Sequence, residues 1–138
     1  DEKRGRFAPA LLLLGSATLE SGNAEAAAAD LDNLIKNYPA SPSAAGAQVI
    51  LAEALTKQSQ ESAARDQLRS LLKKPDLSAE VLYQANFALA DLLLKEGKAF
   101  ESATTYESAL KSAPTPKESE EALYNAALAT ARKSKGKS

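Results

Sequence analysis

A small residue recurs along this chain at nearly constant spacing. Gly15, Ala52, Ala90 and Ala127 are 37, 38 and 37 residues apart, and each lies late in a segment whose apolar residues recur at three and four. A unit of this length cannot bury its apolar face alone, so neighbouring units must stack on one another. The spacing therefore predicts a repeat protein with units that begin at residues 8, 45, 83 and 120.

Turn-forming residues interrupt the apolar pattern at six places, which are Gly22, Pro39, Ser59, Pro75, Gly97 and Pro114 and their neighbours. Between these breaks β-branched residues are few and no long stretch alternates with period two, which favours helices throughout. The expected helices span residues 8–21, 24–37, 43–58, 61–74, 78–96, 99–112 and 117–134.

Capping signals support these boundaries. Ser41-Pro42 reads as an N-cap followed by proline at the first helical position, where its missing N–H costs nothing. In Thr115–Glu118 the glutamate can reach back to the N–H of the cap residue and form a capping box. Gly22 and Gly97 suit the left-handed residue that ends a helix.

The resulting architecture is all-α, with three helix pairs followed by a C-terminal helix that caps the array. Its repeat domain covers residues 8–134, with units 8–44, 45–82 and 83–119 and a final helix over 120–134. Residues 1–7 form a polar N-terminal extension and residues 135–138 a polar tail. The 29 alanines among 138 residues supply the small side chains that close helix packing needs, and the 21 leucines fill the core.

Composition excludes several classes of function. The chain has no Cys and no His, so zinc sites of the usual kind and thiol or imidazole catalysis are ruled out. Its 17 basic and 18 acidic residues nearly balance, which argues against binding driven by nucleic-acid phosphates. We expect no cofactor, no metal and no nucleic-acid partner.

The N-terminal segment has some features of a signal peptide, because basic residues precede the apolar run Phe7–Leu14. Asp1, Glu2 and Pro9 argue against that interpretation, and the run is too short to insert into a membrane. The chain does not begin with Met, so we expect it to be a piece of a longer protein. The absence of Cys leaves the compartment open.

No group of residues predicts catalysis. Glycines occur singly, so there is no phosphate-binding loop. The acidic pairs Glu120-Glu121 and Asp30/Asp32 lie on helices expected to face water, without the burial or the charged partner in a cleft that an acid–base pair requires. Serines and threonines have no histidine to activate them. We therefore expect that the chain is not an enzyme.

Read in register, the units resemble the tetratricopeptide repeat, whose units are antiparallel helix pairs of about 34 residues. Signature positions of that family are held by Leu14, Gly15, Ala27 and Pro39 in the first unit, Leu51, Ala52 and Ala64 in the second, Leu89, Ala90, Tyr106 and Pro114 in the third, and Ala126 and Ala127 in the fourth. The resemblance covers residues 8–134 and implies a right-handed α-α superhelix that binds a protein or peptide.

The chain departs from the family pattern in three ways. The usual aromatic residue at the fourth position is missing, Ser102 replaces an alanine, and each unit carries three or four extra residues. Longer units joined by a turn such as Tyr38–Pro42 are similar to those of bacterial cell-envelope members. That similarity implies an envelope or periplasmic location, with the cytoplasm as the alternative.

In this family the first helix of each pair lines the concave face. The fifth position of each unit is apolar and is held by Leu12, Val49, Phe87 and Tyr124. One interpretation is that these side chains pack within the array. The other is a hydrophobic groove for a peptide, with Phe87 and Tyr124 as anchors, because aromatic residues dominate interface energetics.

The thirteenth position reads Glu20, Lys57, Lys95 and Arg132, with cations in three consecutive units. Glu53 and Asp91 precede the two lysines by four residues, the favourable order for an ion pair on one helix. The row is therefore either a solvated face or a site for an acidic peptide.

These observations predict a non-catalytic interaction module. The alternatives are a structural spacer, a segment that self-associates through the apolar residues 7–14, and an accessory domain of a larger enzyme or envelope assembly. Recognition of chaperone tails is not expected, because Leu12 and Ser16 stand where chaperone-binding members carry Lys and Asn.

Overall fold

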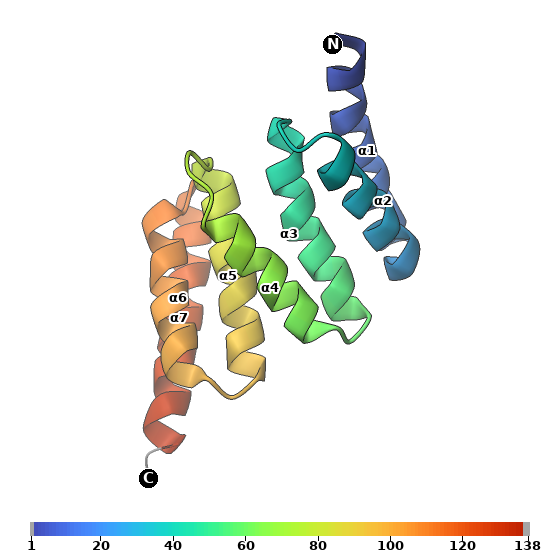
Figure 1. Ribbon diagram of the computed structural model, residues 1–138. Helices are drawn as coiled ribbons and strands as arrows, with labels where there is room; N and C mark the ends of the chain where they lie inside the picture. The colour runs from blue at the N-terminus through green and yellow to red at the C-terminus, as the bar shows by residue number, and fades with distance from the viewer. Residues whose placement is uncertain (1, 137–138) are drawn as a thin grey trace. The chain divides into compact units, whose positions relative to one another are not determined.

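The computed structural model describes the backbone of residues 2–136 and the side chains of residues 7–132 (Figure 1). Residues 2–136 form seven helices and no strand, which confirms the all-α prediction and is consistent with a helical repeat. The helices are α1 (Glu2–Glu20), α2 (Ala24–Asn37), α3 (Pro42–Lys57), α4 (Glu61–Leu72), α5 (Ala79–Lys95), α6 (Ala99–Ser112) and α7 (Pro116–Gly136). The chain divides between Leu71 and Leu72 into two compact units, called unit 1 and unit 2 below.

The largest difference from the expected boundaries is at α1, which begins at Glu2 rather than at residue 8 and contains Pro9. Proline costs a helix one backbone hydrogen bond and crowds the preceding turn. Pro9 is the eighth residue of α1 and therefore lies beyond the first turn, but Glu2, Lys3 and Arg4 before it are good helix formers. The helix therefore continues through Pro9. At the other end α7 extends to Gly136, and the expected tail residues Lys137 and Ser138 lie outside the described residues.

The predicted caps at Ser41 and Thr115 are confirmed, whereas Oε2 of Glu118, the residue expected to complete the capping box, is buried without a hydrogen-bond partner. Ser41 caps α3 and its Oγ accepts a hydrogen bond from the backbone N–H of Ser43 at 3.2 Å, with Pro42 at the first helical position. Thr115 Oγ1 accepts from the N–H of Glu118 at 3.3 Å. Two further caps were not foreseen, at Asn23 of α2 and Ser78 of α5. Each cap satisfies a backbone donor that the first turn leaves without a partner.

A left-handed residue follows three helices at the repeat spacing. Gly22 has φ +97° and Gly97 has φ +85°, as predicted, while Ser59 holds the same place between them with φ 61°. The three residues are 37 and 38 apart, so the backbone repeats with the same period as the small residues. Ser59 carries a strain that glycine avoids.

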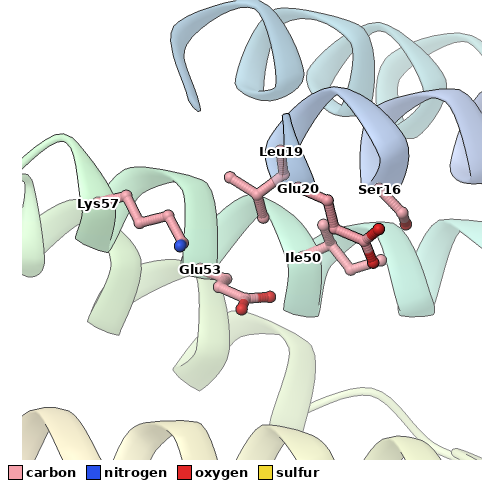
Figure 2. Close-up of a pocket in the computed structure, with 6 residues that line it drawn as sticks. All are labelled: Ser16, Leu19, Glu20, Ile50, Glu53 and Lys57. Carbon is pink, nitrogen blue, oxygen red and sulfur yellow. The ribbon is translucent and has the colours of Figure 1, made fainter. Parts of the chain in front are cut away.

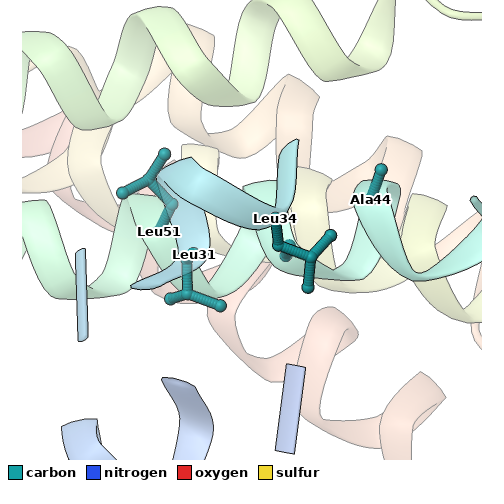
Figure 3. Packing of buried hydrophobic residues seen from close by; sticks show 5 residues of the cluster. Leu31, Leu34, Ala44 and Leu51 are labelled. Carbon is teal, nitrogen blue, oxygen red and sulfur yellow. The ribbon is translucent and has the colours of Figure 1, made fainter. Parts of the chain in front are cut away.

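Unit 1 is held together by an aliphatic core. Leu31, Leu34, Ala44 and Leu51 are buried in it, and Figure 3 shows their packing. A Cβ atom added to Gly15 would lie 2.6 Å from Cδ2 of Leu31, so α1 and α2 approach as closely as the predicted crossing requires.

Unit 2 has a more polar core around Tyr106 and Ala90. Ser102, which replaces the family's usual alanine, is fully buried and donates a hydrogen bond from Oγ to the carbonyl oxygen of Ala90 at 2.8 Å. A buried hydroxyl costs free energy unless it is bonded. This bond explains how the departure from the family pattern is tolerated.

The prediction that all four small residues lie at helix crossings is confirmed for three and wrong for one. Gly15, Ala52 and Ala90 are buried, whereas Ala127 on α7 is exposed. The reason is that no described helix follows α7 to pack over this position.

Candidate functional site

The odd-numbered helices of unit 1 enclose a shallow pocket. Its volume is about 220 Å³, and Figure 2 shows the lining residues, which are Ser16, Leu19 and Glu20 of α1 and Ile50, Glu53 and Lys57 of α3. In repeat numbering, Ser16 and Glu53 hold the ninth position of their units, and Glu20 and Lys57 the thirteenth. Of the residues predicted to bind a partner, Lys57 lines this pocket, and the others lie outside its lining.

The pocket combines an apolar part with a charged part. Leu19 is buried and Ile50 half-buried, while Glu20, Glu53 and Lys57 are exposed. Two carboxylates and one ammonium group give the lining a net negative charge, so Lys57 does not act here as an isolated cation.

Unit 2 contains an aromatic cluster. The Phe87 ring of α5 lies between two tyrosines, 5.6 Å from the Tyr83 ring and 5.3 Å from the Tyr106 ring of α6, centre to centre. Tilted and edge-on contacts at these distances are favourable. Phe87 therefore contributes to the packing of its own unit, and part of its ring is exposed.

The two tyrosine hydroxyls are both engaged. Tyr106 donates a hydrogen bond to Oδ1 of Asp91, and Tyr83 donates to the backbone carbonyl oxygen of Glu118 at 3.2 Å. Burial raises the pKa of Tyr106, and its bond to Asp91 raises this pKa further. Burial also raises the pKa of the Asp91 carboxyl, although the bond from Tyr106 acts in the opposite direction. The pair thus holds a tyrosine that stays protonated beside a partly enclosed carboxyl.

The four residues of the fifth position have different environments. Leu12 is half-buried and packs against the core of unit 1, and Val49 and Phe87 are also half-buried, whereas Tyr124 of α7 is exposed. Equivalence in the repeat thus predicts the face on which these residues lie but not their exposure.

All three cations of the thirteenth position are exposed. Lys57 lies in the pocket of unit 1, Lys95 ends α5, and Arg132 lies near enough to Tyr106 for its charge to lower the pKa of that hydroxyl. Sequence reasoning treated Asp91 only as an ion-pair partner for Lys95 and missed its bond to Tyr106. Sequence spacing could not reveal this bond, because Tyr106 lies on the next helix.

Two further observations limit the chemistry of the described part of the chain. Among its side chains, no group of three or more Asp, Glu, His or Cys residues could hold a metal ion. Within residues 2–136, no helix has both the length and the apolar character needed to cross a bilayer.

A small residue buried at the repeat spacing in α1, α3 and α5, with a left-handed residue after each of these helices, defines a helical repeat protein. The model of the tetratricopeptide repeat family matches residues 12–80, which is half of the chain. The chain belongs to the tetratricopeptide repeat family, whose repeats generally mediate protein–protein interaction. No curated protein matches the chain.

Proposed function

We propose that the chain is a non-catalytic interaction module whose units bind a peptide or a partner protein, each through its own odd-numbered helices. The observation that carries this proposal is the pocket between α1 and α3, because it lies at the ninth and thirteenth positions of two consecutive units. Membership of a family that mediates protein–protein interaction supports the same conclusion. The family is typically non-catalytic, in agreement with this role.

In unit 1 the proposed ligand group is a basic side chain of the peptide. Leu19 and Ile50 offer apolar surface to the aliphatic stem of a lysine or arginine, and Glu20 and Glu53 offer carboxylates to its charged end. Leu12 and Val49 lie on the same helices and would contact the peptide beside the pocket. Lys57 would orient an acidic group of the peptide.

In unit 2 the proposed contacts are made by α5 and α7. The exposed part of Phe87 and the ring of Tyr124 would supply apolar contact, and Lys95 and Arg132 would attract acidic side chains of the ligand. Each unit would therefore select a different charge in its ligand.

The test is a peptide array that spans basic and acidic sequences, probed with the 138-residue chain. Glu53→Lys reverses one carboxylate of the pocket and should weaken the binding of basic peptides about tenfold. The matched control is Glu25→Lys on α2, which makes the same charge change at an exposed glutamate outside the pocket. Equal losses in the two variants, or no binding of any peptide, would reject the pocket as the site.

Tyr124→Ala tests the unit 2 contact without disturbing its core, because the Tyr124 ring is exposed. Phe87→Ala is less informative, since Phe87 also packs between Tyr83 and Tyr106. Unchanged peptide recovery by Tyr124→Ala would remove Tyr124 from the proposed site.

A further inference from the structure

The outer side of α1 is an exposed apolar surface without charge. From position 7 to position 19 the sequence contains no charged residue. Phe7 and Leu14 are 57% and 52% exposed, and Ala10 and Ala17 are exposed on the same side of the helix. These four residues are called the α1 face below. Contiguous exposed apolar side chains on one helix indicate an interaction surface.

The repeat shows how the same positions are used elsewhere in unit 1. The residues that follow those of the α1 face by 37 positions lie on α3 and are all buried, and they are Ala44, Ala47, Leu51 and Ala54. They pack in clusters with Ala27, Leu31 and Leu34 of α2. Helix α2 runs antiparallel to α3 (Figure 1). On α3 this side is therefore covered by the second helix of the preceding pair.

Unit 2 shows the same arrangement with different side chains. On α7 three of the four corresponding residues are buried, namely Ala122, Ala126 and Ala129. They lie in clusters with Tyr106 and Ala109 of α6, the helix that precedes α7. In each unit, then, the second helix of one pair covers this side of the next helix. On α1 the same side is exposed, with no described helix in front of it.

We propose that the α1 face docks the second helix of a further helix pair, which packs against it as α2 packs against α3. The occupant is an amphipathic helix whose apolar stripe is spaced like Ala27, Leu31 and Leu34. Because the α1 face carries no charge, burial of apolar surface is the driving force. A second copy of the chain does not offer such a stripe, since the corresponding residues of α2, α4 and α6, among them Leu31, Leu68 and Tyr106, are already buried.

Thiol labelling tests this docking, because the chain has no Cys and Ala17 is exposed. In an extended chain, residues 1–7 are replaced by a further copy of residues 8–44, which places a copy of α2 ahead of α1 at the repeat spacing. Ala17→Cys, made in the original residue only, should be labelled rapidly in the 138-residue chain. In the extended chain it should be labelled at least about tenfold more slowly, because the docked helix buries it. Equal rates in the two chains would overturn the proposal.

The matched control is the extended chain with Leu31→Asp and Leu34→Asp in the added copy alone. Buried carboxylates in the apolar stripe should prevent docking and restore rapid labelling of Ala17→Cys. Ala54→Cys is the reference for a covered position and should be labelled slowly in all three chains. Continued protection of Ala17→Cys by the charged copy would contradict the proposal, because the apolar stripe would then not be what shields the thiol.

Protein concentration distinguishes the proposed occupant from a second copy. In the 138-residue chain the labelling rate of Ala17→Cys should not depend on concentration. A rate that falls as the concentration rises would assign the α1 face to self-association and overturn the proposal.

This proposal is independent of the proposed function, because the α1 face and the unit 1 pocket share no residue. Glu53→Lys should weaken the capture of basic peptides and leave the protection of Ala17→Cys in the extended chain unchanged. The added helix pair should in turn leave peptide capture by the pocket unchanged, so each proposal can fail separately.

Discussion

Unit 1 and unit 2 both contain two closely packed helices, but the side chains around the close contact differ. In unit 1 the close approach of two helices is made by Gly15 against Leu31, and the surrounding core is aliphatic. In unit 2 the corresponding helices approach at Ala90, and the core contains two hydrogen bonds, from Ser102 to the Ala90 carbonyl and from Tyr106 to Asp91. The repeat therefore fixes where a small residue is needed, while the chemistry around it differs from unit to unit.

The largest effect on stability is expected from a substitution at the close contact between α1 and α2 in unit 1. Gly15→Leu would force a side chain into space that Leu31 already occupies, since even a Cβ atom would meet Leu31 at 2.6 Å. Overpacking of a dense core should lower the free energy of unfolding by about 3 kcal/mol. Urea denaturation monitored by circular dichroism measures this change. An unfolding midpoint equal to that of the wild type would show that α1 and α2 do not pack as described.

The hydrogen-bonded core of unit 2 is tested by Tyr106→Phe, which removes the hydrogen bond to Asp91 and keeps the aromatic ring. Loss of a hydrogen bond to a charged acceptor should lower the free energy of unfolding by about 2 kcal/mol at neutral pH. Asp91→Asn, which keeps an oxygen acceptor for the hydroxyl, is the matched control and should cost less. An equal loss in the free energy of unfolding for Asp91→Asn and Tyr106→Phe would contradict this prediction.

The same tyrosine should give unit 2 a distinctive response to high pH. Folding raises the pKa of Tyr106 above its ordinary value of 10.0, so the folded state keeps a proton that the unfolded state loses. Stability from this group is present below about pH 10 and declines as the pH rises above it. Thermal unfolding between pH 9 and pH 11 should therefore show a steeper decline for the wild type than for Tyr106→Phe. Parallel declines would contradict the assignment.

A smaller effect is expected at the left-handed residue that follows α3 in unit 1 and α5 in unit 2. Ser59→Gly should raise the free energy of unfolding by about 0.5–1 kcal/mol, because glycine accepts a positive φ without strain. The reverse change, Gly97→Ser, should cost about 1 kcal/mol through the backbone alone, since an added Cβ meets nothing within 4 Å. Changes of the same sign in both variants would show that the positive φ does not determine the effect of these substitutions.

The smallest effect is expected at the fourth small residue. Ala127→Leu should change the stability of the dilute chain by less than about 0.5 kcal/mol, because the side chain would point into solvent. It is the direct counterpart of Gly15→Leu. A loss as large as that of Gly15→Leu would mean that the outer face of α7 is covered within one chain.

The difference between Gly15 and Ala127 also shows what sequence can predict. Helix ends were predictable at Ser41 and Thr115 because a cap acts on backbone groups two or three residues away. The start of α1 was missed because proline usually breaks the interior of a helix, whereas α1 runs through Pro9.

Burial was harder to predict, because it depends on which helices are adjacent. Phe87 and Tyr124 hold the same repeat position, yet one lies between two tyrosines and the other is exposed. The candidate site followed the same pattern. Of the residues predicted to bind a partner, Lys57 lines the pocket. The negative charge of the pocket and the bond from Tyr106 to Asp91 could not be predicted, because they depend on side chains from different helices.

The most direct test of this account is the rate at which a single thiol is labelled at the small-residue position of different units. Ala52→Cys should be labelled slowly because that position is buried. Ala127→Cys should be labelled rapidly because that position is exposed. Equal labelling rates for the two variants would contradict the account.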